Sequence, residues 1–101
     1  MPAYAVNMKH SAESCPLFND VTMNKFKEGM GRREESAKKH DVKVLTACAV
    51  LLEHLILYVV EAPSQSAVEE YLKETGWAFF NDVQIREVQF VEEIGKRYGI
   101  L

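Results

Sequence analysis

The sequence predicts an α+β fold of the ferredoxin-like class, a β-α-β-β-α-β sandwich with helices on one face of a four-stranded antiparallel sheet. Three observations predict this class. Alternating apolar residues occur near both ends of the chain, two amphipathic segments lie between them, and a long apolar stretch fills the middle. The 101 residues, 48% of them hydrophobic, suit a single domain over 1–101.

The first element is a strand from Ala3 to His10, because two sets of side chains alternate along it. One set is Tyr4, Val6, Met8 and His10, and the other is Ala3, Ala5, Asn7 and Lys9. The following segment, Ser11 to Asp20, is rich in serine, asparagine and aspartate, and its Pro16 disfavours helical dihedrals at the residue before it. A loop therefore leads from this strand to the first helix.

The first helix is expected from about Val21 to His40. Apolar and long side chains recur there at steps of three and four residues, at Met23, Phe26, Met30, Arg33 and Ala37. Gly29 and Gly31 oppose a continuous helix, since each costs about 1 kcal/mol relative to alanine. A bend, or a close approach by another segment, would explain them.

Two apolar runs follow, Val42 to Val50 and His54 to Ala62, and we interpret them as the two strands of a hairpin. The alternative is one buried helix, because alanine and leucine are frequent here and no turn glycine separates the runs. The β-branched content and the stop at Pro63 favour the hairpin.

Pro63 and Ser64 open a second helix, which Gly76 closes. Its apolar stripe comprises Ala67, Val68, Tyr71 and Leu72. The alternation from Val83 to Val88 predicts the fourth strand, and Val91, Ile94 and Tyr98 suit a short terminal helix.

Two right-handed β-α-β crossovers predict the sheet order 4-1-3-2. We expect the first and third strands to be parallel neighbours. The helices cover only one face of this sheet, although both faces of the second and third strands are apolar. An uncovered apolar face is a partner surface, and a second copy of the chain is the expected partner, giving a homodimer.

The charge and cysteine content exclude several classes of partner. A net charge of -3 does not favour binding to nucleic acid. Two cysteines are too few for a disulfide framework, and no signal segment precedes Tyr4, so we expect a cytoplasmic protein without disulfides. The apolar stretch Val42 to Val60 approaches the length of a membrane span, but Lys43, Glu53 and His54 interrupt it, so no membrane partner is expected. No phosphate loop, Ser/His/Asp arrangement or CxxC pair is present, and we expect no cofactor.

The segment Tyr58 to Ser64, with the helix through Tyr71 and the strand Val83 to Val88, resembles small uncharacterised domains of the dimeric α+β barrel superfamily. GYD-type domains are the closest group. The shared feature is the join from strand through Glu-Ala-Pro to helix, and the match covers about the second half of the chain. The resemblance implies two sheets joined into a barrel, with a cavity between sheet and helices in each subunit.

Members of this superfamily include small monooxygenases, haem-degrading enzymes and lactone isomerases, so the fold alone decides no function. The haem-degrading members use an asparagine on the first strand, a tryptophan, and a histidine near the second helix. Asn7 and Trp77 match the first two, but no histidine follows Trp77. Haem degradation is therefore not expected.

Three residues are candidate metal ligands. His10 and Glu61 end the first and third strands, which as parallel neighbours would emerge at one edge of the sheet, with Cys15 in the loop beyond. Imidazole, thiolate and carboxylate suit a soft or borderline transition metal, and His10 with Glu61 would also suit general base catalysis. The alternative is structural, with Cys15 a loop thiol packed beneath Pro16.

The remaining histidines and the second cysteine are expected to lie elsewhere. Parallel pairing would place His54 near Tyr4, away from His10. His40 ends the first helix, where the helix dipole favours a protonated imidazole. Cys48 is expected to be a small buried hydrophobic residue.

Aromatic and apolar side chains supply a candidate ligand pocket, with core packing as the alternative. These side chains are Tyr4, Met8, Tyr58, Trp77, Phe79 and Phe80. The expected function is a dimeric domain that binds a small ligand or a metal ion. The alternative is a cofactor-independent monooxygenase or isomerase for an aromatic or lactone-like substrate, with His10 or His54 as base and Asn7 and Tyr58 as orienting groups.

Overall fold

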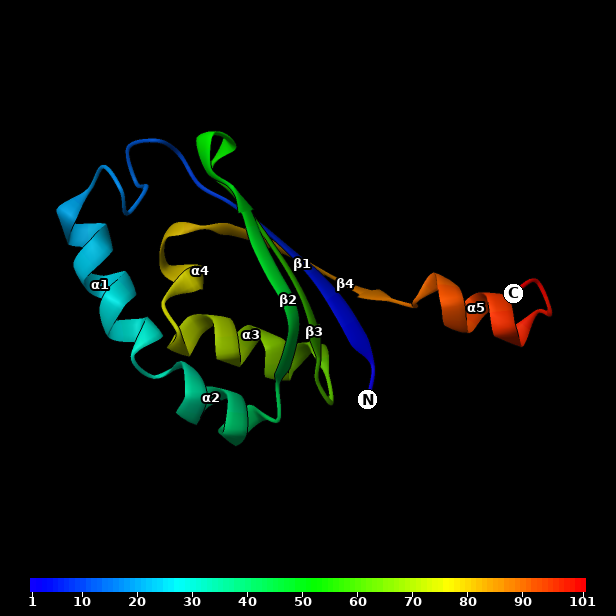
Figure 1. Cartoon of the computed structure of the whole chain (residues 1–101). Helices are drawn as coiled ribbons and strands as arrows, with labels where there is room; N and C mark the ends of the chain where they lie inside the picture. The colour runs from blue at the N-terminus through cyan, green and yellow to red at the C-terminus, as the bar shows by residue number, and fades with distance from the viewer.

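A computed structural model describes all 101 residues, and its four strands form one antiparallel sheet in the order β2-β3-β1-β4. The strands are β1 (Ala3–Lys9), β2 (Lys43–Val50), β3 (Leu55–Glu61) and β4 (Asp82–Val88). The helices that precede β4 in the chain lie on one side of this sheet, and the other side is open (Figure 1). The predicted ferredoxin-like class and strand order are confirmed.

The direction of β3 corrects one prediction. β1 and β3 are antiparallel neighbours, with Lys9 opposite Leu55 and Ala3 opposite Glu61. The reason lies in the connections, because the helical crossover makes β2 parallel to β1 and the tight hairpin then reverses the chain. The end of β1 therefore meets the start of β3.

The first predicted helix is two helices, α1 (Asp20–Met30) and α2 (Arg33–His40), separated at Gly31. Asn19 caps α1 by accepting a hydrogen bond from the Thr22 N–H. Gly29 allows a close approach, because a Cβ at this position would lie 2.5 Å from the carbonyl carbon of Thr75. Gly31 thus lies at the break between the helices and Gly29 at a close approach, which are the two explanations expected for glycines in this segment.

The hairpin prediction is confirmed, and the buried-helix alternative is excluded. A short 3₁₀ turn, η1 (Leu51–Glu53), joins β2 to β3. His54 completes the turn in the left-handed conformation, with φ of 55°, which residues other than glycine adopt rarely. A β-bulge near Leu45 shifts the register between Val44 and Thr46.

The second half contains α3 (Gln65–Glu74), α4 (Trp77–Phe80) and α5 (Val91–Arg97). Ser64 caps α3 by accepting a hydrogen bond from the Ala67 N–H, and Gly76 has φ of 85° at its end. The short α4 was not predicted. Beyond β4, α5 projects away from the sheet and its covering helices (Figure 1). No helix is both long and apolar enough to cross a membrane.

The core lies between the sheet and α3, with α1 and α4 packing at one end. Its buried members are Tyr4, Val6, Met8, Val42, Tyr58, Val60, Ala62, Val68, Tyr71, Leu72 and Trp77. All eight residues of the edge strand β2 are exposed. Cys48 is therefore exposed rather than buried as predicted, because neither face of β2 is covered by a helix.

Candidate functional site

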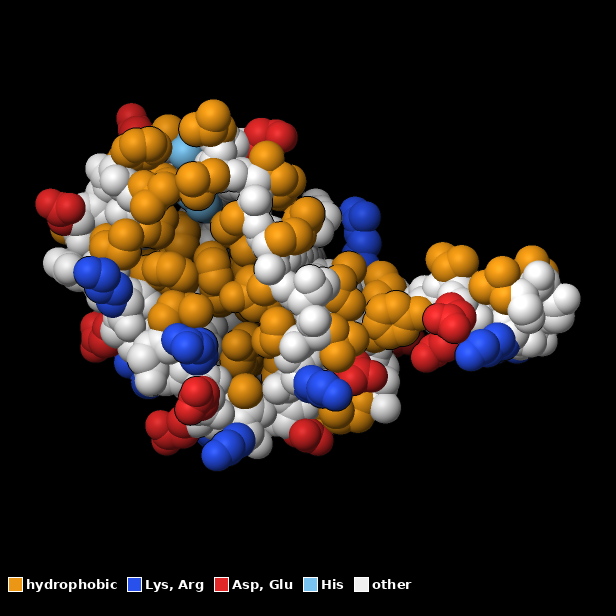
Figure 2. Space-filling model, in the orientation of Figure 1, with side chains coloured by type: hydrophobic (Ala, Val, Ile, Leu, Met, Phe, Trp, Pro, Cys, Tyr) orange, Lys and Arg blue, Asp and Glu red, His pale blue; other side chains and the backbone are white.

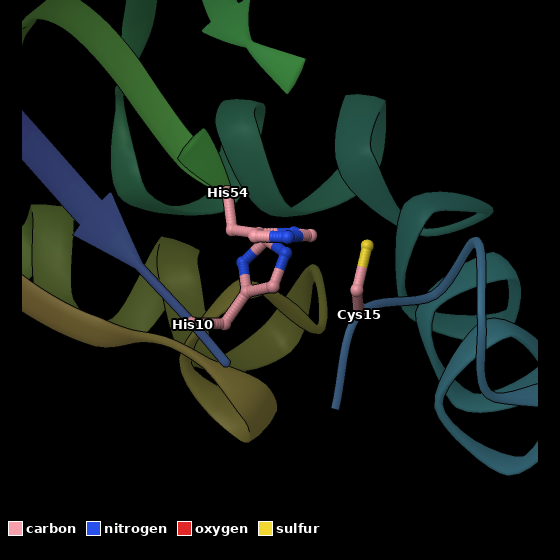
Figure 3. A group of neighbouring side chains, drawn as sticks. All are labelled: His10, Cys15 and His54. Carbon is pink, nitrogen blue, oxygen red and sulfur yellow. The ribbon is translucent and has the colours of Figure 1, made fainter. Parts of the chain in front are cut away.

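Two histidines and a cysteine meet at the end of the sheet where β1 stops and β3 begins. One ligand atom each from His10, Cys15 and His54 all lie within 4.8 Å of one another. The Cys15 thiol points toward the two imidazole rings (Figure 3). Segments that are far apart in the sequence thus bring together three side chains of types that can bind a metal ion.

Backbone structure holds these three residues in place. His10 directly follows β1, and its N–H donates to the His54 carbonyl at 3.2 Å, which extends the β1–β3 pairing by one bond. Cys15 lies in a turn, where its N–H donates to Ala12 and its carbonyl accepts from Phe18. The Cys15 side chain is only 4% exposed, so the thiol faces the protein interior.

Asn81 orients the His10 ring. The Asn81 amide nitrogen donates to the Trp77 carbonyl at 2.9 Å, which turns its Oδ1 toward Nδ1 of His10 at 2.7 Å. Because an amide oxygen only accepts, Nδ1 carries the proton in neutral His10. The lone pair then lies on Nε2, which is the form that binds a metal or accepts a proton.

Two ring nitrogens at this site are buried without any hydrogen-bond partner, Nε2 of His10 and Nδ1 of His54. Leaving a buried polar atom unpaired costs about 1–3 kcal/mol. The rings pack edge-on against each other, with centroids 5.3 Å apart, and His10 also packs on Phe80. The site thus combines unsatisfied nitrogen atoms with an apolar surrounding, which is the arrangement that an ion or ligand would satisfy.

A cavity of about 170 Å³ adjoins the three residues, and ten of its thirteen lining residues are hydrophobic. Figure 2 shows histidine side chains surrounded by apolar ones on this part of the surface. The lining comprises His10, Cys15, Pro16, Leu17, Met23, Phe26, Val50, Leu51, His54, Leu55, Ile56, Trp77 and Phe80. No acidic or basic side chain other than histidine lines it.

The structure places His54 where Glu61 was expected. Glu61 pairs with Ala3 at the far end of β3, so it does not join His10 and Cys15. The predicted separation of His54 from His10 is wrong for the same reason, because both inferences assumed parallel strands. His40 lies apart, with its Nε2 donating to Glu74 at 2.9 Å.

The residues predicted to line a pocket occupy different places. Tyr4, Met8 and Tyr58 are buried in the core, whereas Trp77 and Phe80 line the cavity beside the histidines. Phe79 is 50% exposed and lies under the Lys25 ammonium group. The space between sheet and helices is filled at its centre, so the cavity lies at one end.

Neither predicted orienting group, Asn7 or Tyr58, lines the cavity beside the histidines. Asn7 alternates with the core residues Val6 and Met8, so its exposed side chain faces the open side of the sheet. Burial raises the pKa of Tyr58 above the ordinary 10.0, and burial also raises the pKa of Tyr71. Both phenols therefore remain protonated at neutral pH, and neither acts as a base there.

Asn81 was missed by sequence reasoning, although it follows an aromatic segment and precedes β4. A signal was available in the connections. In the order 4-1-3-2 the first and last strands are antiparallel neighbours, so the residue before β4 lies beside the residue after β1. Lys9 indeed pairs with Asp82, which brings Asn81 next to His10.

Comparison with known proteins identifies the fold and no more. No protein-family model matches the chain, and no curated protein matches it in sequence. Among solved structures, the crystal structure of an antibiotic biosynthesis monooxygenase is similar, with a TM-score of 0.50 and 10% sequence identity. The likeness covers 90% of this chain and 99% of that one, and at this identity it shows a shared ferredoxin-like α+β fold.

Proposed function

We propose that this chain is a metal-binding protein of the dimeric α+β barrel type, with His10, Cys15 and His54 as the ligands. The proposal rests on the convergence of one thiol and two imidazoles, whose ligand atoms all lie within 4.8 Å of one another. One nitrogen of each imidazole is buried and has no hydrogen-bond partner. Asn81 supports the proposal, because metal-ligating histidines almost always donate their second N–H to a neighbouring acceptor.

The donor set indicates which ions suit the site. Thiolate and imidazole favour soft or borderline transition metals such as zinc, cobalt and copper, whereas magnesium and calcium prefer oxygen ligands. Ligand atoms of one zinc ion lie about 3.3–3.8 Å apart, given bond lengths of about 2.0–2.3 Å. The side chains would therefore close by about 1 Å on binding, which a small rotamer adjustment provides.

A second copy of the chain is the proposed partner of the open sheet face. Leu57 and Val59 lie on this face, and their register partners Cys48 and Thr46 share it. An apolar strip on an uncovered sheet face is typical of an interface, and two-fold homodimers are the commonest soluble oligomers. The resemblance to dimeric α+β barrels favours the same arrangement.

Metal content of the purified chain tests the proposed function. Protein that has been demetallated and reloaded with Zn²⁺ should retain about one ion per chain, measured by elemental analysis after gel filtration. Cys15→Ser and His10→Ala should each lose most of the ion. The matched controls Cys48→Ser and His40→Ala should retain it, because both residues lie outside the site.

Zinc retention by the Cys15→Ser and His10→Ala variants at the wild-type level would contradict the proposal. So would an equal loss from the two control variants, since that result would indicate binding elsewhere. Circular dichroism on every variant separates loss of the ligand from loss of the fold.

A second candidate function is a cofactor-independent monooxygenase or isomerase in which His10 is the general base. The specific observation is that the Asn81 hydrogen bond leaves Nε2 of His10 unprotonated beside an apolar cavity. The structural neighbour is an antibiotic biosynthesis monooxygenase, although 10% identity carries only the fold. A base of this kind needs no thiol, so activity of the metal-free Cys15→Ser variant on an aromatic substrate would favour it over metal binding.

A further inference from the structure

We propose that a divalent ion at His10, Cys15 and His54 keeps one coordination position open toward the cavity, where it binds a small organic anion with an apolar body. An aromatic carboxylate represents this ligand class. The inference rests on the proposed metal site and adds the class of ligand that the bound ion would take. Three features of the cavity carry it: the number of donors, the net charge and the shape.

The number of protein donors leaves a coordination position vacant. Structural zinc sites have four protein ligands, whereas sites that bind a substrate have three and leave the fourth for water or substrate. Here three strong ligands converge, and the rest of the cavity wall offers only the weak thioether of Met23. The Trp77 indole donates a proton and cannot ligate a cation.

The charge at the site favours an anion. A divalent ion with one thiolate and two neutral imidazoles has a net charge of +1. No aspartate or glutamate lines the cavity to neutralise it. An unbalanced charge in an apolar environment is unfavourable, so a fourth ligand that carries a negative charge is preferred over a neutral one.

The shape of the cavity favours an apolar body of about one ring. Its volume is about 170 Å³, and an apolar cavity of about 150 Å³ in another protein holds benzene. Phe26, Trp77 and Phe80 form an aromatic wall, with ring centroids 4.6 Å apart for Phe26 and Trp77. Acetate would leave this surface in contact with water, whereas benzoate would cover it.

Three probes on the Co²⁺-loaded full chain test the ligand class. Thiolate-ligated Co²⁺ absorbs visible light, and the spectrum changes when a ligand enters its coordination sphere. Benzoate, benzamide and acetate are titrated in turn. Benzamide has the ring without the charge, and acetate has the charge without the ring. Benzoate should bind at least about tenfold more tightly than acetate, since burial of a ring contributes about that much. It should also bind more tightly than benzamide, which brings no negative charge to the ion.

Two neighbouring leucines provide the matched variants. Leu51 lines the cavity and is 62% exposed, so a larger side chain at its edge narrows the opening without disturbing the core. Leu52 is 89% exposed and does not line it. Leu51→Trp should keep the Co²⁺ spectrum and lose at least about tenfold in benzoate affinity. Leu52→Trp should match the wild-type protein in both respects.

The outcomes separate this inference from the metal site itself. Equal affinities for the three probes, or unchanged benzoate binding in Leu51→Trp, would overturn the anion site while Co²⁺ remains bound. Benzoate binding of the same strength to metal-free protein, measured by calorimetry, would show that the ion is not its partner and would also overturn it. A chain that takes up no Co²⁺ would overturn both proposals.

Discussion

The hydrogen bond between His10 and Asn81 determines which nitrogen of the imidazole is available. Without it, the ring could carry its proton on either nitrogen and could rotate within the apolar surroundings. The bond therefore prepares Nε2 before any ion or substrate arrives. This preparation matters equally for metal binding and for general base catalysis.

Replacement of Asn81 by leucine should weaken metal binding by about 10- to 100-fold, as loss of an orienting partner does in other metal sites. Competition with a chromophoric chelator measures the change. Asn7→Leu is the matched control, because Asn7 is exposed on the opposite face of the sheet and should leave the affinity unchanged. Wild-type affinity in Asn81→Leu would contradict the orienting role.

Glu74 joins α3 to α2 through three side chains. The hydrogen bond from His40, with further ones from Ser36 and Lys39, lowers the pKa of Glu74 from 4.5 to about 2. Because the carboxylate has its ordinary pKa when the chain is unfolded, its stabilising effect is complete above about pH 4.5. The effect is then lost as the pH falls toward about 2.

Glu74→Gln should therefore lower the thermal unfolding midpoint at neutral pH, and the difference from wild type should shrink between about pH 4.5 and 2. Unfolding followed by circular dichroism across this range measures it. Glu70→Gln provides the control, because Glu70 makes one surface ion pair with Lys73. If the difference in unfolding midpoint stayed constant down to the acid end of this range, the charge of Glu74 would not be the cause of its stabilising effect.

The junction of α1 with α3 depends on the absence of a side chain at Gly29. The next glycine, Gly31, has an ordinary helical φ of −64° and no close neighbour, since a Cβ there would lie 3.4 Å from its nearest atom. Gly29 and Gly31 are two residues apart in the sequence, but only Gly29 lacks the space for a side chain. They form a natural pair for mutagenesis.

Gly29→Ala should destabilise the protein by about 1–3 kcal/mol, because the new methyl group must displace the backbone at Thr75. Gly31→Ala should be neutral or stabilise by up to about 1 kcal/mol, because alanine restricts the unfolded chain. Urea unfolding measures both. If the two variants had equal stability, the close approach of the helices would not be the reason for Gly29.

Most of the elements followed from periodicity and capping, whereas the site followed only in part, because His10 and Cys15 were expected together but His54 and Asn81 were not. The alternation in β1, the Ser64 cap and the Gly76 stop are local signals that the structure retains. The position of His54 depends on strand direction, which is a property of the connections rather than of any local pattern. Asn81 was missed because α4 is only four residues long and has no periodic signal.

At the scale of the whole molecule, the sheet is covered on one side only, and the proposed homodimer covers the other. Leu57→Lys combined with Val59→Lys should convert the dimer to a monomer, because a charge buried in an interface costs several kcal/mol. Sedimentation velocity at micromolar concentration measures the mass. Val21→Lys, on the exposed surface of α1, is the control. A wild-type mass equal to one chain would contradict the dimer.

The exposed strand β2 has a consequence for the isolated chain. From Val44 to Val50 it contains no charge and no proline, and its backbone edge is unpaired. Uncharged β-prone segments of this length are typical of the sequences that form cross-β fibrils when they are exposed on an edge. The edge of β2 therefore offers a template for strand addition and fibril growth.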